Sequence, residues 1–358
     1  IPSVLAFNQS MKTNSTQSSP HLSVRPEWLD LHQEDIIEPD LPIVDAHHHL
    51  WDRPENQYLL PDLRRDLDAG HNVRATVAVE AGAMYRSDGA EEMRPVGETE
   101  FLNGIAAMSA SGRYGTSRMC AGIVGHADLR LGESVRPVLD AQIRAGGGRF
   151  RGVRYMSIWH PDPTARASLA NPPPYVLRDP AFRRGFAQLA PLGLSFDAWM
   201  AHTQLAELVE LAPAFPNTVI ILNHVGGPIG IGPYAGKRDE VFAAWRTSIR
   251  EVARYPNVQI KLGGLGMRLF GFDFSSRARP PTSEELAAAW RPYIETCIEA
   301  FGAERCMFES NFPVDKVSYS YGVLWNAFKR LSSTYSPAER SAMFHDTAMR
   351  VYSLSDAA

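Results

Sequence analysis

The chain has 358 residues, of which 44% are hydrophobic and 21% are charged, as in an ordinary globular protein. Its formal net charge of -4 gives no basic field that would attract nucleic acid or an anionic membrane surface. No run reaches the roughly 18 apolar residues that a membrane span needs. We therefore expect a small-molecule substrate and no nucleic-acid or membrane partner, and the sequence leaves a homo-oligomer open.

The cysteines and the amino-terminal residues bear on the setting of the protein. Cys120, Cys297 and Cys306 are widely spaced and form no C-x-x-C pair, so we expect buried free thiols and a reducing, cytoplasmic setting. The first 20 residues are polar with a short apolar patch, which argues against a signal peptide. We expect residues 1–40 to form a partly irregular N-terminal arm and residues 41–354 to form one domain.

Beyond the arm, strand-like runs alternate with helical patterns to the end of the chain. The strand-like runs are mostly continuous and apolar, as in parallel strands covered on both faces, and lie at 43–45, 75–80, 119–124, 152–155, 194–198, 218–222, 258–262 and 305–308. Helical patterns lie at 98–111, 133–144, 180–192, 204–215, 238–255, 283–301 and 319–332. Thr282-x-x-Glu285 and Ser336-x-x-Glu339 predict capping boxes at two helix starts.

Eight strands alternating with helices fit either a closed barrel or a doubly wound open sheet. The count of eight favours a single α/β domain, a (β/α)8 TIM barrel. The longer segments at 156–178, 223–237 and 263–282 follow strands, so they predict long βα loops over a substrate pocket.

The strongest local signal is Val44-Asp45-Ala46-His47-His48-His49 at the end of the first strand. Because side chains alternate along a strand, His47 and His49 share a face while His48 points away. Their Cα atoms would lie about 6.6 Å apart, so both rings can converge on one divalent cation, for which zinc is the expected ion. The alternative is three histidines with ordinary hydrogen bonds, but the strand-end position favours metal ligands.

Two more histidines follow later strands. His224, in Leu222-Asn223-His224-Val225-Gly226-Gly227-Pro228, comes as the sixth strand ends, where it could bind metal, orient a water or polarise a carbonyl. His202 follows the fifth strand and is a third candidate metal ligand. A lone histidine is more often a satisfied core residue, and His202 could instead cap or pack on the next helix.

Polar groups also crowd the chain as it leaves the eighth strand, in Phe308-Glu309-Ser310-Asn311-Phe312-Pro313 and on to Asp315. Asn311 offers an amide, whereas Glu309 and Asp315 offer carboxylates. One of them could act as a general base, or all three could serve turns and helix caps.

Other strand ends supply charged and aromatic groups. Glu80 ends the second strand, Arg154 ends the fourth and Lys261 lies in the seventh, and a charge buried there needs a partner, a metal or a substrate. The guanidinium of Arg154 could hold a substrate carboxylate, although a salt bridge to Glu80 or to a loop acid fits equally well. The remaining candidates for substrate binding are Trp51, His126 and Trp159.

As an ordered set from about Leu41 to Tyr352, these motifs, together with Arg151-Gly152-Val153-Arg154, resemble the amidohydrolase-2 branch of the amidohydrolase superfamily. The resemblance implies a distorted (β/α)8 barrel and hydrolysis of lactones of the pyrone-dicarboxylate, sugar-acid or muconolactone type, with decarboxylases as more distant relatives. It implies that His47 and His49 are the first-strand metal pair, with His202 near the fifth-strand ligand. It also implies that His224 contacts substrate or activates water and that Arg154 holds a substrate carboxylate, as in some relatives.

The sequence departs from that family at Asn311, where relatives usually carry an aspartate that binds metal and acts as the general base. An asparagine cannot accept a proton from water. Either another acid, Asp315 or Glu80, is then the base, or the site works without a tightly bound cation, as is thought for some lactonases of the branch.

The leading hypothesis is hydrolysis of a lactone or related cyclic ester that bears a carboxylate. A divalent metal or a histidine would activate the water, and His224 and Asp315 would handle protons. The alternatives are a metal-dependent decarboxylase or C–C hydrolase on the same barrel, and a non-catalytic barrel that binds an acidic metabolite.

Overall fold

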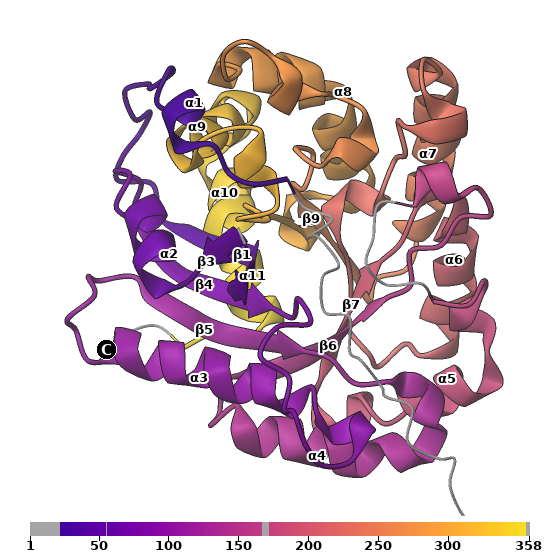
Figure 1. The fold of residues 1–358 in the computed structure, drawn as a ribbon. Helices are drawn as coiled ribbons and strands as arrows, with labels where there is room; N and C mark the ends of the chain where they lie inside the picture. The colour runs from indigo at the N-terminus through magenta and orange to yellow at the C-terminus, as the bar shows by residue number, and fades with distance from the viewer. Residues whose placement is uncertain (1–21, 55, 167–171, 356–358) are drawn as a thin grey trace, which may run out of the picture.

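The computed structural model describes residues 22–54, 56–166 and 172–355, so the first 20 residues of the expected arm lie outside the described part of the chain. Eight parallel strands follow one another around a single sheet, with helices on its outer side (Figure 1). The strands are β1 (Ile43–His48), β4 (Val73–Val79), β5 (Arg118–Gly125), β6 (Phe150–Met156), β7 (Ser195–Trp199), β8 (Ile220–Leu222), β9 (Val258–Leu262) and β10 (Cys306–Phe308).

The sheet closes on itself between its first strand and the segment that follows its last. The amide of His49 donates to the carbonyl of Phe312 (2.7 Å), and the amide of Asn311 donates to the carbonyl of His47 (2.8 Å). Parallel pairing therefore continues around the whole ring, which confirms the predicted (β/α)8 barrel.

All eight predicted strands are present, with ends that differ by a few residues. The helices are α1 (Pro26–Leu29), α2 (Leu60–Leu67), α3 (Val96–Ala110), α4 (Arg136–Ala145), α5 (Pro180–Phe186), α6 (Leu205–Ala214), α7 (Arg238–Val252), α8 (Ser283–Phe301), α9 (Tyr321–Leu331), α10 (Pro337–Ser341) and α11 (Thr347–Val351). Both capping boxes are confirmed, because the amide of Glu285 donates to Thr282 Oγ1 and that of Glu339 to Ser336 Oγ. The hairpin of β2 (Trp51–Arg53) and β3 (Asn56–Tyr58) was not predicted, since strands of three residues are too short to show a period.

The interior of the barrel contains an apolar cluster and, at the carboxyl ends of the strands, a layer of charged side chains. Small and branched side chains from the strands form a cluster that Tyr352 and Leu354, after α11, complete. Tyr352 links this cluster to the charged layer, because its hydroxyl donates to the fully buried Asp197 (3.0 Å). The charged layer is thus joined to the apolar cluster through Tyr352.

Three further expectations can be compared with the fold. Cys120, Cys297 and Cys306 are buried free thiols, as predicted. Among the described residues, no helix is both long enough and apolar enough to cross a membrane. Part of the expected arm packs on the barrel, since Trp28 is buried and its Nε1 donates to the carbonyl of Arg277 (3.0 Å).

Candidate active site

Histidine and charged side chains gather at the carboxyl ends of the barrel strands. His47 lies near the end of β1, Arg154 in β6 and Lys261 in β9, whereas His224 and Glu309 lie just beyond β8 and β10. All five are buried. In a (β/α)8 barrel this end of the strands carries the chemistry, so the cluster is the candidate active site.

Glu309 lies between two histidines and holds the centre of the cluster together. Its Oε1 is 2.7 Å from Nδ1 of His224, and its Oε2 is 3.0 Å from Nδ1 of His47. Among the described residues, these three form the one set of three or more histidine, cysteine or acidic side chains whose ligand atoms all lie within 4.8 Å of one another. The arrangement requires a glycine at position 264, where a Cβ would lie 2.5 Å from Nδ1 of His224.

Donors lie against both ring nitrogens of His47. Lys261 Nζ lies 3.1 Å from Nδ1 and Arg154 Nη1 lies 3.4 Å from Nε2, and both groups can only donate. Nε2 of His47 also faces Nε2 of His49 at 3.2 Å, while Nδ1 of His49 donates to the carbonyl of Val79 (2.8 Å). Burial, followed by the charge of Lys261, holds the pKa of His47 well below its usual range, so the ring is neutral.

The neutral ring of His47 faces the carboxylate of Glu309. Nδ1 of His47 and Oε2 of Glu309 are 3.0 Å apart, and Oε2 of Glu309 is buried with no hydrogen-bond partner among the described residues. Among the described residues, Glu309 also forms no ion pair with a lysine or arginine. A buried carboxylate without a compensating charge is unfavourable, so the site suits a cation at this point.

The two cationic side chains of the site are already paired with acids. Arg154 Nε donates to Glu80 Oε1 (2.8 Å), and Lys261 Nζ donates to Asp197 Oδ1 (2.7 Å). For Arg154, the salt bridge to Glu80 that the sequence left open is thus the one observed. Asp197 was missed by the sequence analysis, although an acid in the otherwise apolar run 194–198 is a usable signal.

The residues after β10 divide between two environments. Asn311 and Asp315 pair with each other, because Asn311 Nδ2 donates to Asp315 Oδ1 (2.9 Å). Asp315 Oδ2 accepts from the amide of Gly266 (2.9 Å) and the hydroxyl of Tyr319 (2.6 Å). Burial raises the pKa of Asp315 to about 7, a value compatible with proton transfer, but its contacts are those of a residue that orders the β9 loop. Its role as a base stays a prediction, and Glu309 is the acid that contacts the histidines.

His202 lies apart from the three-residue set. Its Nδ1 accepts from the amide of Ile229 (3.2 Å), its ring packs edge-on against Tyr234, and burial lowers its pKa to about 4. It is not among the side chains that converge on Glu309. These contacts are those of the packed histidine that the sequence gave as the alternative, and its role as a metal ligand stays a prediction.

The expected substrate-binding residues lie at different depths. Trp51 is buried and its ring stacks on His49 at 5.8 Å, directly beside the histidines. His126 is half-buried and its Nδ1 is 3.3 Å from the carbonyl of Arg154. Trp159 is half-buried in the loop after β6, where its amide donates to Gln204 Oε1 (2.8 Å). Of these three candidates, Trp51 is thus the one that contacts the site histidines, as Lys261 also does.

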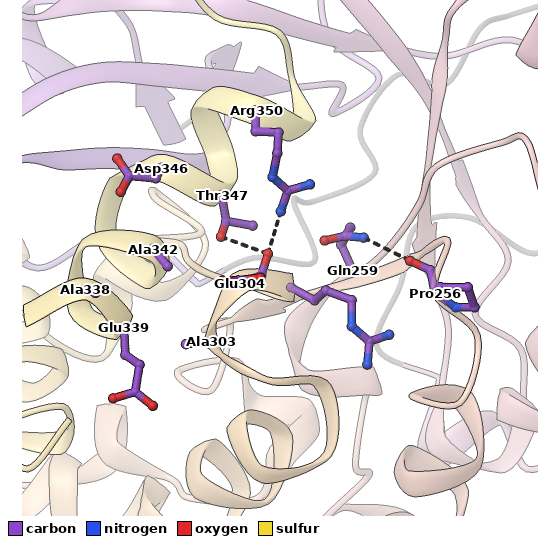
Figure 2. A pocket seen from close by; sticks show the side chains of 11 residues that line it. Pro256, Gln259, Ala303, Glu304, Ala338, Glu339, Ala342, Asp346, Thr347 and Arg350 are labelled. Atoms are coloured by element: carbon purple, nitrogen blue, oxygen red, sulfur yellow. Dashed lines mark hydrogen bonds between the residues drawn. The ribbon is translucent and has the colours of Figure 1, made fainter. Parts of the chain in front are cut away.

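A pocket of about 600 Å³ lies at the opposite end of the barrel, where β9 and β10 begin (Figure 2). Gln259 donates there to the carbonyl of Pro256, and the carbonyl of Glu304 accepts from Thr347 and Arg350. None of the predicted site residues lines this pocket. The amino-terminal face of such barrels serves stability, so we do not assign the chemistry to it.

Comparison with known proteins agrees with the barrel fold and with a hydrolase site at the carboxyl ends of its strands. Residues 44–354 match the protein family described as Amidohydrolase. The chain is 37% identical over 330 residues to the uncharacterised protein y4mH of Sinorhizobium fredii, covering 87% of this chain and 99% of that one. It is 27% identical to an L-fucono-1,5-lactonase of Burkholderia multivorans, covering 88% of this chain and 97% of the lactonase.

Among solved structures, an amidohydrolase of Burkholderia multivorans with bound zinc has a TM-score of 0.67 and 26% identity, covering 87% of this chain and 99% of that one. The zinc in that relative and the histidine–glutamate set here both support a divalent metal. The family match over most of the barrel carries the assignment. The chain therefore belongs to the amidohydrolase family of hydrolases.

Proposed function

We propose that the protein opens the ring of a sugar-acid lactone, a neutral cyclic ester with several hydroxyl groups. The observation that carries the proposal is the buried set of His47, His224 and Glu309 at the catalytic end of the barrel. Two relatives named L-fucono-1,5-lactonase and one named L-rhamnono-gamma-lactonase support the substrate class.

A carboxylate on the substrate, as the sequence led us to expect, is not part of this proposal. Arg154 was the intended anchor, but its Nε donates to Glu80 Oε1, and a second nitrogen donates to the carbonyl of Glu80. The positive charge is thus compensated before substrate arrives. A neutral lactone needs no such anchor, so the ion pair favours the sugar lactones over dicarboxylate lactones.

The residues present fit a divalent ion, and zinc is the ion we propose. His47, His224 and Glu309 would hold it, since imidazole nitrogens and carboxylate oxygens are preferred zinc ligands. Oε2 of Glu309 lies 3.0 Å from Nδ1 of His47 and has no hydrogen-bond partner in the described part of the chain, and a cation would satisfy it. Such an ion, when bound, polarises the ester carbonyl and lowers the pKa of a water.

The protein side chains orient the two histidines. Arg154 Nη1 and Lys261 Nζ lie 3.4 Å and 3.1 Å from the two ring nitrogens of His47, so they hold that ring in place at the centre of the site. Glu309 orients His224 through Nδ1 and its backbone amide (3.2 Å), while no described residue hydrogen-bonds Nε2 of His224. That nitrogen is therefore the one that His224 can offer to the ion.

The test measures proton release on a panel of 1,5- and 1,4-sugar lactones and a pyrone dicarboxylate, for the protein as purified, after chelation and after zinc is restored. We expect turnover of the neutral lactones, its loss on chelation and about one zinc per chain. Glu309→Gln should lose zinc and turnover while keeping the fold. Exposed Glu299→Gln is the matched control. Turnover of the dicarboxylate alone, or full turnover by Glu309→Gln, would refute the proposal.

A further inference from the structure

A second group of buried polar atoms lies beside the histidines, at the carboxyl end of β4. Oε2 of Glu80, Oε2 of Glu98 and Nη1 of Arg53 are buried, and none of them has a hydrogen-bond partner among residues 22–54, 56–166 and 172–355. Glu80 follows β4, Glu98 lies in the first turn of α3, and Arg53 ends β2. Three elements thus bring two acids and one guanidinium close enough to interact through their charges.

The backbone of Ala81 joins two of the three side chains. Glu98 Oε1 accepts from the amides of Ala81 (2.8 Å) and Ala83 (3.2 Å), while Arg53 Nη2 donates to the carbonyl of Ala81. Glu80 is held by Arg154, which donates to its Oε1. Each side chain is therefore fixed through one polar atom and leaves another without a partner.

The group borders the candidate active site. The guanidinium of Arg53 lies 4.1 Å from the ring centroid of Trp51, which stacks on His49. On the other side, Arg154 links Glu80 to His47 through its Nη1 at 3.4 Å. A ligand at the histidines would therefore have this group next to it.

The charges of the group suit hydroxyl groups better than ions. Burial, followed by the negative charge of Glu80, raises the pKa of Glu98 to about 8, so Glu98 is mostly a neutral acid at pH 7. Glu98 and Arg53 then offer donors, and Glu80 offers an acceptor. Neighbouring hydroxyl groups of a sugar ring both donate and accept, whereas a carboxylate would meet the carboxylate of Glu80.

No hydrogen bond between described residues uses these atoms. Buried polar groups are nearly always paired, because an unmade hydrogen bond costs the desolvation of the group. One polar atom of each side chain already forms the hydrogen bonds that hold the segment after β4. The other polar atom of each is not needed for those contacts. A ligand that uses the free atoms accounts for their presence.

We propose that Arg53, Glu80 and Glu98 form a subsite that binds adjacent hydroxyl groups of a neutral polyhydroxylated lactone and so determines substrate specificity. The inference rests on the proposed lactone hydrolysis and names the residues that distinguish a sugar lactone from a bare ring.

The experiment compares a sugar 1,5-lactone with δ-valerolactone, which has the same ring and no hydroxyl groups. Glu98→Met removes the free donor together with the oxygen that accepts from the amides of Ala81 and Ala83, so circular dichroism checks that this variant folds. Arg53→Met removes the free guanidinium donor and leaves those amides paired. Glu100→Met, on the exposed face of α3, is the matched control. We expect both subsite variants to lower kcat/KM on the sugar lactone by roughly 10- to 100-fold and on δ-valerolactone by less than about threefold.

A second readout does not depend on turnover. Calorimetry on the metal-free protein measures binding of the corresponding sugar lactam, a neutral analogue that resists hydrolysis, and both variants should weaken it by about tenfold or more. Equal losses on both lactones together with unchanged lactam binding would overturn the subsite. If the wild type opens neither lactone but binds the lactam through Glu98 and Arg53, the proposed hydrolysis fails and the subsite stands.

Discussion

The ion pair of Lys261 and Asp197 allows a double-mutant cycle that tests the charged layer of the barrel. Both side chains are fully buried, and Nζ lies 2.7 Å from Oδ1 of Asp197. At that distance two unit charges attract by about 6 kcal/mol at an effective dielectric constant of about 20, and desolvation offsets much of this. Tyr352 and Asn223 donate to the same carboxylate, so Asp197 keeps two neutral donors when the lysine is removed.

Lys261→Met leaves the Asp197 carboxylate buried without a cation, so we expect it to lower the free energy of unfolding by about 3–5 kcal/mol. Asp197→Asn leaves the ammonium without its acid and should cost a similar amount. The double variant removes both charges, so its loss should fall below the sum of the single losses by about 2–4 kcal/mol.

Equilibrium urea unfolding of the four proteins, followed by tryptophan fluorescence and by circular dichroism, measures the cycle. Arg250→Met and Glu299→Gln supply the matched control, because that exposed pair lies 3.9 Å apart on the surface and should couple by less than about 1 kcal/mol. Losses at Lys261 and Asp197 that add within about 0.5 kcal/mol would refute the reasoning, since independent sites show that additivity.

Further outcomes concern the packing of the site and its titration. Gly264→Ala should push the His224 ring away from Glu309 and lower kcat/KM by about 100-fold. Gly302→Ala is the control, because Gly302 has a similar φ of +76° and a Cβ there would meet no heavy atom within 4 Å. It should cost about 1 kcal/mol of stability and leave turnover unchanged. Unchanged turnover in Gly264→Ala would show that the ring position is not critical. Because the folded-state pKa of Glu98 is raised from 4.5 to about 8, its contribution to stability is present below pH 4.5 and is lost as the pH rises to 8, by up to about 1.4 kcal/mol per pH unit. Urea unfolding of Glu98→Gln between pH 5 and 8.5 should therefore show a flatter pH dependence than the wild type, and parallel curves would contradict the assignment. Asp315→Asn should flatten the curve in the same way between about pH 4 and 7, because the pKa of Asp315 is raised from 3.8 to about 7.

The sequence predicted the barrel because parallel strands leave a mark along the chain. Each strand is covered on both faces, so it appears as an apolar run, and eight such runs alternate with helical patterns. The same logic located the site. Groups at the carboxyl ends of parallel strands meet at one end of a barrel, which placed His47, His224, Arg154 and Lys261 together.

The centre of the site was harder to predict. The family resemblance led us to expect an acid at position 311, and because an asparagine stands there, we considered Asp315 and Glu80 as the base. In the structure, Glu309 is the acid that contacts both histidines. The relevant signal was present, because Glu309 is the first carboxylate after the eighth strand. Its use depends on which way the side chain turns as the chain leaves β10, and a pattern of residue types does not report that direction.

The sequence by itself determined the order of strands and helices, the end of the barrel that carries the chemistry, and the histidines found there. Only the tertiary structure decided which charges compensate one another. Arg154 is neutralised by Glu80 from β4, Lys261 by Asp197 from β7, and Glu309 by neither cation. The physical reason is that hydrophobic periodicity records local burial. The partner of a buried charge is instead set by distances of about 3 Å between elements that closure of the barrel brings together.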